Sequence, residues 1–168
     1  MPPQQRQLSL LQECGFTWPR PGVWSWPPDA HIALALLVAL PVWGALGLFL
    51  GPHLRAPAGW LAWVSLVLVQ PLLEELVFRG LLQGQALRLV SANGQPRRLG
   101  PLTMANMLVT LGFVALHLRA QPLAWALAVA LPSLVLGHLR ERTGSVWPAV
   151  LVHAFYNAGF GLTAWLLT

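Results

Sequence analysis

Five long apolar segments, separated by short connections that hold most of the charged residues, constrain the fold of this chain more than any other feature. An α-helix needs about 20 mostly apolar residues to cross the hydrocarbon core of a bilayer. The second segment is followed by charged residues, but its helical pattern continues to about residue 90. The sequence therefore predicts an all-α bundle of about five transmembrane helices. The segments cover about residues 31–50, 58–73, 102–118, 123–139 and 146–167.

The composition agrees with a chain that folds in lipid. Of the 168 residues, 56% are hydrophobic and 9% are charged, whereas soluble domains carry about 25% charged residues. We divide the chain into an N-terminal cytoplasmic or interfacial segment, 1–29, and one transmembrane domain, 30–168. The first segment has no apolar run long enough for a signal peptide. Its residues Trp18, Trp24 and Trp26 stand among prolines, which favours an irregular stretch on the membrane surface.

The basic residues predict the orientation of the helices. All ten are arginines, and cytoplasmic connections of membrane proteins are enriched in basic residues. With the N-terminus in the cytoplasm, eight arginines lie inside and only Arg55 and Arg119 lie outside. We therefore expect a multi-pass protein of the cell inner membrane with its C-terminus outside. Nucleic acid is not an expected partner, because the arginines do not follow one face. The eight are Arg6, Arg20, Arg79, Arg88, Arg97, Arg98, Arg140 and Arg142.

Polar clusters within three of the apolar segments are the candidates for function. Ionisable side chains are costly at membrane depth and need partners or a functional reason. A single such residue often only joins neighbouring helices, but three clusters on three predicted helices indicate a shared site. The clusters are Glu74, Glu75 and Arg79; Phe113 and His117; and His153 and Asn157.

The two carboxylates of the first cluster, Glu74 and Glu75, are expected to have different roles. Glu75 and Arg79 are four residues apart and meet on one helical face, where the arginine neutralises the carboxylate. Adjacent helical residues point about 100° apart, so Glu74 is free to face a cavity. A carboxylate there suits general-base activation of water.

The other two clusters supply partners for that water. His153 and Asn157 are also four residues apart, and together they can stabilise an oxyanion. His117 can orient the water or share its proton. A divalent metal held by Glu74, His117 and His153 remains an alternative, because two histidines and one glutamate form a catalytic zinc set. His138 is expected at the interface, and His31 and His53, at helix ends, are given no role.

In this order, the motifs Glu-Glu-x-x-x-Arg, Phe-x-x-x-His and His-x-x-x-Asn resemble those of the CAAX protease and bacteriocin-processing family, also called CPBP or Abi. The resemblance covers about residues 58–160. It implies an intramembrane endopeptidase in which Glu74 and His117 activate water and His153 and Asn157 stabilise the oxyanion. Glu75, Arg79 and Phe113 are then supporting residues, and the glutamate mechanism needs no metal cofactor. The resemblance also implies an active site open to the cytoplasm.

The chain is shorter than many members of this family. Compact bacterial members resemble glutamic-type proteases of protein-sorting systems, which trim C-terminal tails of membrane-anchored proteins. The expected partners are therefore membrane lipids and a substrate with such a tail or a lipidated cysteine. The alternatives are a non-catalytic bacteriocin-immunity or scaffold protein of the same fold, and a small transporter with a proton relay.

The depths of Glu74 and His117 conflict if each helix starts at its first apolar residue. At about 1.5 Å per residue, the two side chains are then too far apart to share a water molecule. We expect the second helix to continue well past Arg79, and the third to start in the cytoplasm and enter the membrane near Asn106.

Overall fold

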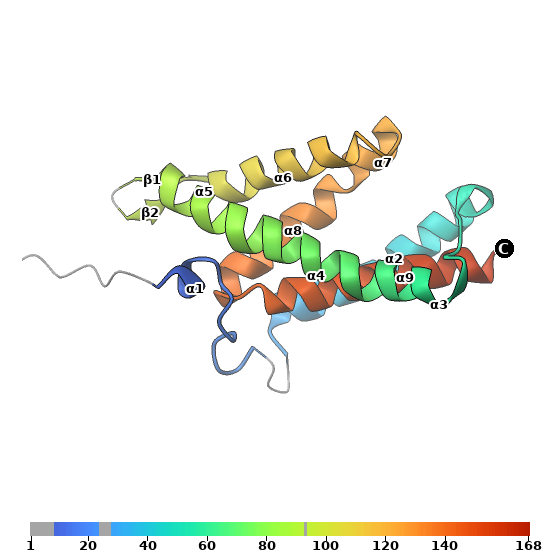
Figure 1. Cartoon of the computed structure of the whole chain (residues 1–168), viewed down its shortest axis with the longest axis horizontal. Helices are drawn as coiled ribbons and strands as arrows, with labels where there is room; N and C mark the ends of the chain where they lie inside the picture. The colour runs from blue at the N-terminus through green and yellow to red at the C-terminus, as the bar shows by residue number, and fades with distance from the viewer. Residues whose placement is uncertain (1–8, 24–27, 93) are drawn as a thin grey trace, which may run out of the picture.

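The computed structural model describes residues 9–23, 28–92 and 94–168. Within them, four helices are long and apolar enough to cross a membrane, and Met104–His117 forms a shorter apolar helix. The predicted all-α bundle of about five membrane helices is therefore confirmed. Figure 1 shows the long helices running along the same axis, with α1, β1 and β2 at one end and α3 and the C-terminus at the other. The long helices are Ala30–His53, Gly59–Val90, Leu123–Thr143 and Trp147–Leu166.

Several of these long helices combine shorter elements. A turn of 3₁₀-helix, η1 (Gly51–His53), ends the first helix, and two π-helical stretches, η2 (Ser65–Val69) and η3 (Leu76–Leu82), form part of the second. Two two-stranded antiparallel hairpins connect the second and third helices. The other elements are α1 (Leu10–Glu13), α2 (Ala30–Leu50), α3 (Gly59–Val64), α4 (Gln70–Glu75), α5 (Gln83–Val90), β1 (Ser91–Ala92), β2 (Gln95–Pro96), β3 (Arg98–Leu99), β4 (Leu102–Thr103), α6 (Met104–His117), α7 (Leu123–Ala128), α8 (Ala130–Thr143) and α9 (Trp147–Leu166).

The second helix is much longer than its apolar run. It extends without a break over 32 residues, to Val90, and so continues past Arg79 as the sequence predicted. At about 1.5 Å per residue it is about 48 Å long, whereas the hydrocarbon core is about 30 Å thick. It is therefore longer than the core is thick, and Glu74, the sixteenth of its 32 residues, lies near its middle.

Glycines set the closest approaches between helices. A Cβ atom at Gly137 of α8 would lie 2.0 Å from Oδ1 of Asn106 on α6. A Cβ atom at Gly159 of α9 would lie 2.0 Å from the Trp43 ring on α2. Small residues at helix contacts allow this approach in membranes, where helices gain little from excluding water.

The described part of the N-terminal segment, residues 9–23, packs against the helix ends. Arg140 Nη2 donates a hydrogen bond to the Glu13 carbonyl at 2.7 Å, and the Val146 amide donates to the Gly15 carbonyl at 2.9 Å. Cys14 is buried there. The segment is thus held by the protein itself, whatever its relation to the membrane surface. Of the three tryptophans noted in the sequence, Trp18 is exposed, and Trp24 and Trp26 lie outside the described residues.

Replacing Gly84 with alanine should release this segment. A Cβ atom at Gly84 would lie 2.7 Å from the Glu13 carbonyl oxygen, which is backbone and cannot turn aside. We expect Cys14, the one cysteine of the chain, to react faster with a thiol reagent in Gly84→Ala than in the wild type. Gly112→Ala is the control, because nothing lies within 4 Å of a Cβ there. Equal protection of Cys14 in all three proteins would contradict the docking.

Asp29 should make stability depend on pH in the acid range. Hydrogen bonds from Arg142 at 3.0 Å hold the pKa of Asp29 below its ordinary value. A lowered folded-state pKa stabilises the protein above the unfolded value of about 3.9, and that stability is lost as pH falls through the folded value. Asp29→Asn keeps an oxygen that can cap α2 but removes the charge. Thermal unfolding should show a stability gap between wild type and variant at pH 7 that shrinks below about pH 4. A constant gap would rule out this contribution.

Candidate active site

A cavity of about 640 Å³ lies between α2, α4, α6, α8 and α9. Its walls include Glu74, His117, His153 and Asn157. The structure therefore brings the four side chains predicted to be catalytic, from three separate helices, to one cavity. Most of the remaining wall is apolar or aromatic, including Trp43, Leu46, Leu66, Trp125, Leu131 and Phe160.

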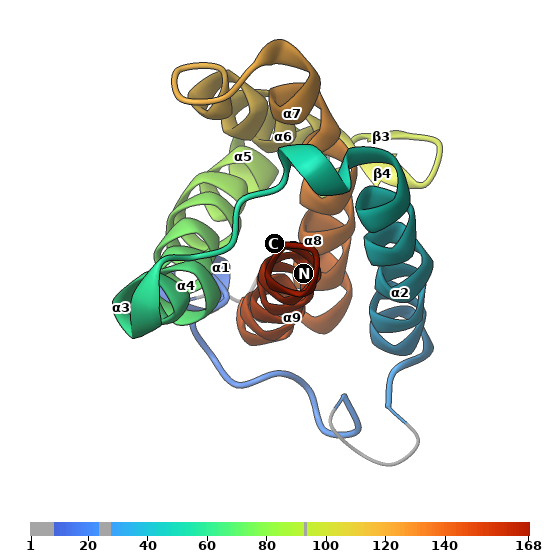
Figure 2. The same ribbon diagram turned by 90° about the vertical axis from the view of Figure 1, so that its right-hand side faces the viewer.

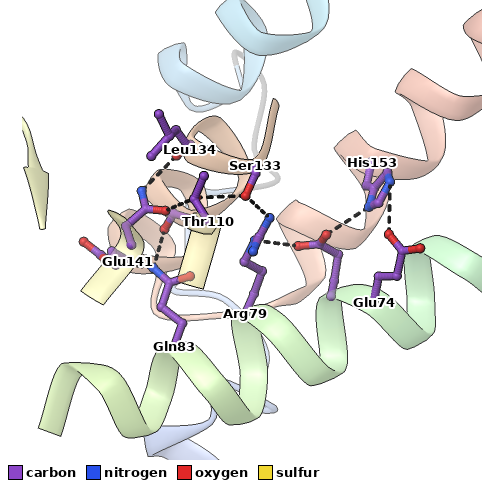
Figure 3. A network of polar contacts seen from close by, with 11 residues as sticks. Glu74, Arg79, Gln83, Thr110, Ser133, Leu134, Glu141 and His153 are labelled. Carbon is purple, nitrogen blue, oxygen red and sulfur yellow. Dashed lines mark hydrogen bonds and ion pairs between the residues drawn. The ribbon is translucent and has the colours of Figure 1, made fainter. Parts of the chain in front are cut away.

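His153 lies between the two adjacent glutamates. Its Nδ1 is 2.9 Å from Glu75 Oε1, and its Nε2 is 3.9 Å from Glu74 Oε2. A carboxylate accepts hydrogen bonds, so Nδ1 donates to Glu75 and Nε2 is left on the side of Glu74 (Figure 3). The Glu75 side chain is fully buried, whereas that of Glu74 is 29% exposed. Glu75 therefore orients the histidine, and Glu74 has access to the cavity.

The predicted pair of Glu75 and Arg79 forms, at 3.2 Å between Oε2 and Nε, with both side chains fully buried. The sequence paired Glu75 with Arg79 alone and missed the contact with His153. This contact joins α4 to α9, which are far apart in sequence, so helical spacing gave no signal of it.

His117 is oriented by its own helix. Its Nδ1 is 2.9 Å from the Phe113 carbonyl oxygen. Because a carbonyl only accepts, Nδ1 carries the proton, and Nε2 of the neutral ring is left as the acceptor. The Phe113 ring packs 4.4 Å from the His117 ring and meets Phe78 edge-on at 4.9 Å, centroid to centroid. These contacts explain the Phe-x-x-x-His spacing physically.

Asn157 satisfies a carbonyl that Pro71 leaves without a partner. In η2 the Gln70 amide donates to the Ser65 carbonyl, five residues back. The next donor in that pattern would come from residue 71, but proline has no N–H. Nδ2 of Asn157 donates instead to the Leu66 carbonyl at 2.9 Å. Asn157 and His153 share the cavity, but this bond joins Asn157 to η2 and not to His153.

Buried hydroxyl and amide groups continue the chain of polar contacts beyond Arg79, starting at Ser133 in the cavity wall (Figure 3). Arg79 Nη2 donates to Ser133 Oγ at 3.1 Å, and Ser133 lies 2.8 Å from Thr110 Oγ1. Thr110 Oγ1 donates its one proton to Asn106 Oδ1 at 3.5 Å. The proton between the two hydroxyls therefore comes from Ser133. The sequence analysis gave no role in the site to Ser133, Thr110 or Asn106. The one available signal was that each is a polar residue within an otherwise apolar segment.

A second set of buried contacts involves Gln83, one turn after Arg79 on the long helix Gly59–Val90. Gln83 Nε2 donates to the Gly137 carbonyl at 3.0 Å and to Glu141 at 2.7 Å. Glu141 also accepts from Thr103 at 2.5 Å. These bonds connect α5 and α8 to β4, the strand that leads into α6.

The residues of the alternative metal set do not form a metal site in this arrangement. Across residues 9–23, 28–92 and 94–168, no three His, Cys, Asp or Glu side chains are grouped so as to hold a metal ion.

Of the three remaining histidines, His31 and His138 lie outside this cavity. His138 Nε2 is 3.0 Å from His31 Nδ1, which joins α8 to the start of α2. His53, to which the sequence analysis gave no role, lines the cavity together with Arg55.

Arg79 should matter far more for stability than an exposed arginine with the same type of partner. Removing one partner of a buried ion pair costs about 3–5 kcal/mol, because the other charge stays buried and unpaired. We expect Arg79→Gln to lower the unfolding temperature strongly. Arg88→Gln, which loses an exposed pair with Glu13 at 3.0 Å, should cost at most about 1 kcal/mol. Similar melting temperatures for the two variants in detergent would contradict this assignment.

Comparison with known proteins places the chain in a family. No curated protein and no solved structure matches it. A family model described as type II CAAX prenyl endopeptidase Rce1-like matches residues 55–159. The match spans more than half of the chain and contains all three polar motifs. The chain therefore belongs to the Rce1-like family of type II CAAX prenyl endopeptidases, which are membrane proteases.

Proposed function

We propose that this protein cleaves a peptide bond near the C-terminus of a membrane-anchored or lipid-modified protein, using water activated by Glu74. The observation that carries the proposal is the position of Glu74, which borders the cavity beside His153. The second carboxylate, Glu75, is fully buried and bonded to His153 and Arg79. Of the two glutamates, only Glu74 therefore has access to a water molecule and a substrate.

One proton is transferred in each of the two stages of the reaction, attack by water and breakage of the C–N bond. Glu74 accepts a proton from water as the water oxygen attacks the carbonyl carbon of the peptide bond. Nε2 of His117, the acceptor left by the bond to Phe113, helps to orient that water. When the C–N bond breaks, the proton held by Glu74 passes to the leaving nitrogen. The products are a new carboxylate and a new amine.

His153 and Asn157 are assigned to the oxyanion. With Nδ1 donating to Glu75, a protonated His153 can donate a second hydrogen bond from Nε2. Asn157 keeps one amide hydrogen after its bond to the Leu66 carbonyl. Donors fixed before the reaction stabilise developing charge without reorganisation, and each is worth about 100- to 1,000-fold in rate. Glu75, Arg79 and Phe113 support these groups and do not react.

The lining of the cavity suits an apolar substrate. Aromatic and aliphatic residues of α2, α7, α8 and α9 make up most of its wall. An apolar C-terminal tail or a lipid-modified cysteine would remove this surface from water, which favours binding. A small-molecule transporter or a non-catalytic scaffold would not require two carboxylates in such different environments beside one histidine.

The decisive assay measures cleavage of tail-bearing and prenylated peptides by purified protein in detergent or liposomes. We expect Glu74→Gln and His153→Ala each to lower the rate by about 100-fold or more. Glu13→Gln is the control, since it makes the same chemical change outside the cavity. A chelator should leave the wild-type rate unchanged.

Each other outcome points to a different function. Loss of cleavage with the chelator would overturn the metal-free mechanism. Full activity in Glu74→Gln would show that Glu74 is not the base. If the folded wild type cuts none of the peptides, the scaffold alternative gains, and proton-coupled flux without any product would indicate a transporter.

A further inference from the structure

We infer that Gln70 and Gln121 bind the backbone of the substrate peptide beside the bond that is cut, so that the site recognises the amide groups of an extended peptide. This inference rests on the proposed protease function and names two specificity-determining residues for it. Neither glutamine belongs to the three polar motifs of the sequence.

A peptide that enters this cavity brings polar groups into apolar surroundings. Each residue except proline carries a backbone N–H and a C=O, and either group is costly to hold away from water without a partner. Most of the cavity wall is apolar or aromatic. The partners of the peptide backbone must therefore come from the few polar side chains of the wall.

Primary amides suit this task, because they hold donors and an acceptor, as a peptide group does. Among the described residues, three amide side chains line the cavity, those of Gln70, Gln121 and Asn157. Nδ2 of Asn157 is already bonded to the Leu66 carbonyl. Gln70 makes one side-chain bond, from Nε2 to Ser65 Oγ at 3.3 Å, and the Gln121 side chain makes none within the part of the chain that the structure describes. The acceptor Oε1 of Gln70 and the whole amide of Gln121 are thus open to a ligand.

Other polar side chains of the wall are bound within the protein. Ser133 accepts from Arg79 at 3.1 Å, and the Tyr156 hydroxyl donates to the Ala35 carbonyl at 3.2 Å. Arg55 donates to two carbonyls of its own connection. The two glutamines are therefore the amides of the wall that are left to pair with a peptide.

The depth of Gln70 also calls for a function. It lies eleven residues, or about 16 Å, from the start of the long helix Gly59–Val90. In residues 59–73 only Ser65 and Gln70 carry a hydroxyl or amide side chain. Polar side chains inside membrane segments are costly and mark functional sites. The single bond to Ser65 leaves the acceptor of Gln70 without a partner, and a substrate N–H would supply one.

The spacing of Gln70 and Glu74 matches an extended peptide. The two residues are four apart, lie on one helical face and both line the cavity. Four residues advance a helix by about 6 Å, which corresponds to about two residues of an extended chain at about 3.3 Å each. Backbone groups two residues apart point to the same side of such a chain. With Glu74 beside the carbonyl that is attacked, Oε1 of Gln70 therefore reaches an N–H about two residues away.

Gln121 stands in the same relation to His117. It follows α6, four residues after His117, and its backbone amide donates to the His117 carbonyl at 2.8 Å. In the end-on view of Figure 2, α4 lies at the left and α6 and α7 at the top, so the two glutamines reach the cavity from different helices. A peptide between them is held from both. Proline at the position that Gln70 contacts is disfavoured, because it has no N–H to donate.

The test combines one change in the protein with one atom changed in the substrate. Gln70→Met keeps the length of the side chain and removes the acceptor. In two versions of the peptide, an ester replaces the amide two residues before or two residues after the cut bond, so that oxygen stands where N–H was. We expect one ester and Gln70→Met each to raise KM about tenfold with kcat changed less than about twofold. The two changes together should raise KM no more than either alone, because they remove the same bond.

Two further variants complete the design. Gln121→Met should also raise KM for the unmodified peptide about tenfold. Gln85→Met makes the same change at an exposed position of the same long helix outside the cavity, and it should leave KM as in the wild type.

The outcomes separate this inference from the proposed function. If both esters raise KM by the same factor in Gln70→Met as in the wild type, Gln70 does not bind the backbone and the inference is overturned. Cleavage with unchanged KM in the Gln70 and Gln121 variants, or with a fall in kcat alone, overturns it as well and leaves the protease function standing. If the wild type cuts no peptide at all, the proposed function fails and the inference fails with it.

Discussion

The buried ion pair between Glu75 and Arg79 is the interaction on which the rest of the site depends. Taking two charges out of water costs several kcal/mol per ion, and only good geometry with further hydrogen bonds offsets this. Here His153 donates to the free oxygen of Glu75, and Ser133 accepts from Arg79. The pair therefore connects α4, α8 and α9 through bonds that each partner needs. The orientation of His153 follows from this requirement.

The helices were predictable because the membrane makes their signal strong. An apolar run of about 20 residues has few other structures open to it, and the continuation past Arg79 followed from helical spacing. The contacts between helices were not predictable in the same way. Gly137 and Gly159 give no sign in the sequence of which side chain they admit. The packing of residues 9–23 depends on backbone carbonyls, which every residue has.

In the candidate site too, contacts within a helix were predictable from the sequence and contacts between helices were not. Spacing within one helix predicted the pair of Glu75 with Arg79 and the shared face of His153 and Asn157. It did not predict that His153 lies between both glutamates, or that Asn157 bonds to the Leu66 carbonyl. Thr110 and Ser133 were passed over because isolated hydroxyl residues are common in membrane helices. Spacing arguments thus predict contacts within a helix and fail for contacts that join helices.

The bond from Asn157 to the Leu66 carbonyl makes positions 71 and 157 depend on each other, although no motif contains both. The carbonyl is open because residue 71 is proline, so the value of an amide at position 157 depends on the residue at position 71. With an N–H at position 71, that carbonyl would have a backbone donor and the amide of Asn157 would be released. The residues at positions 71 and 157 should therefore co-vary among relatives: changes at the two positions should occur together more often than chance allows.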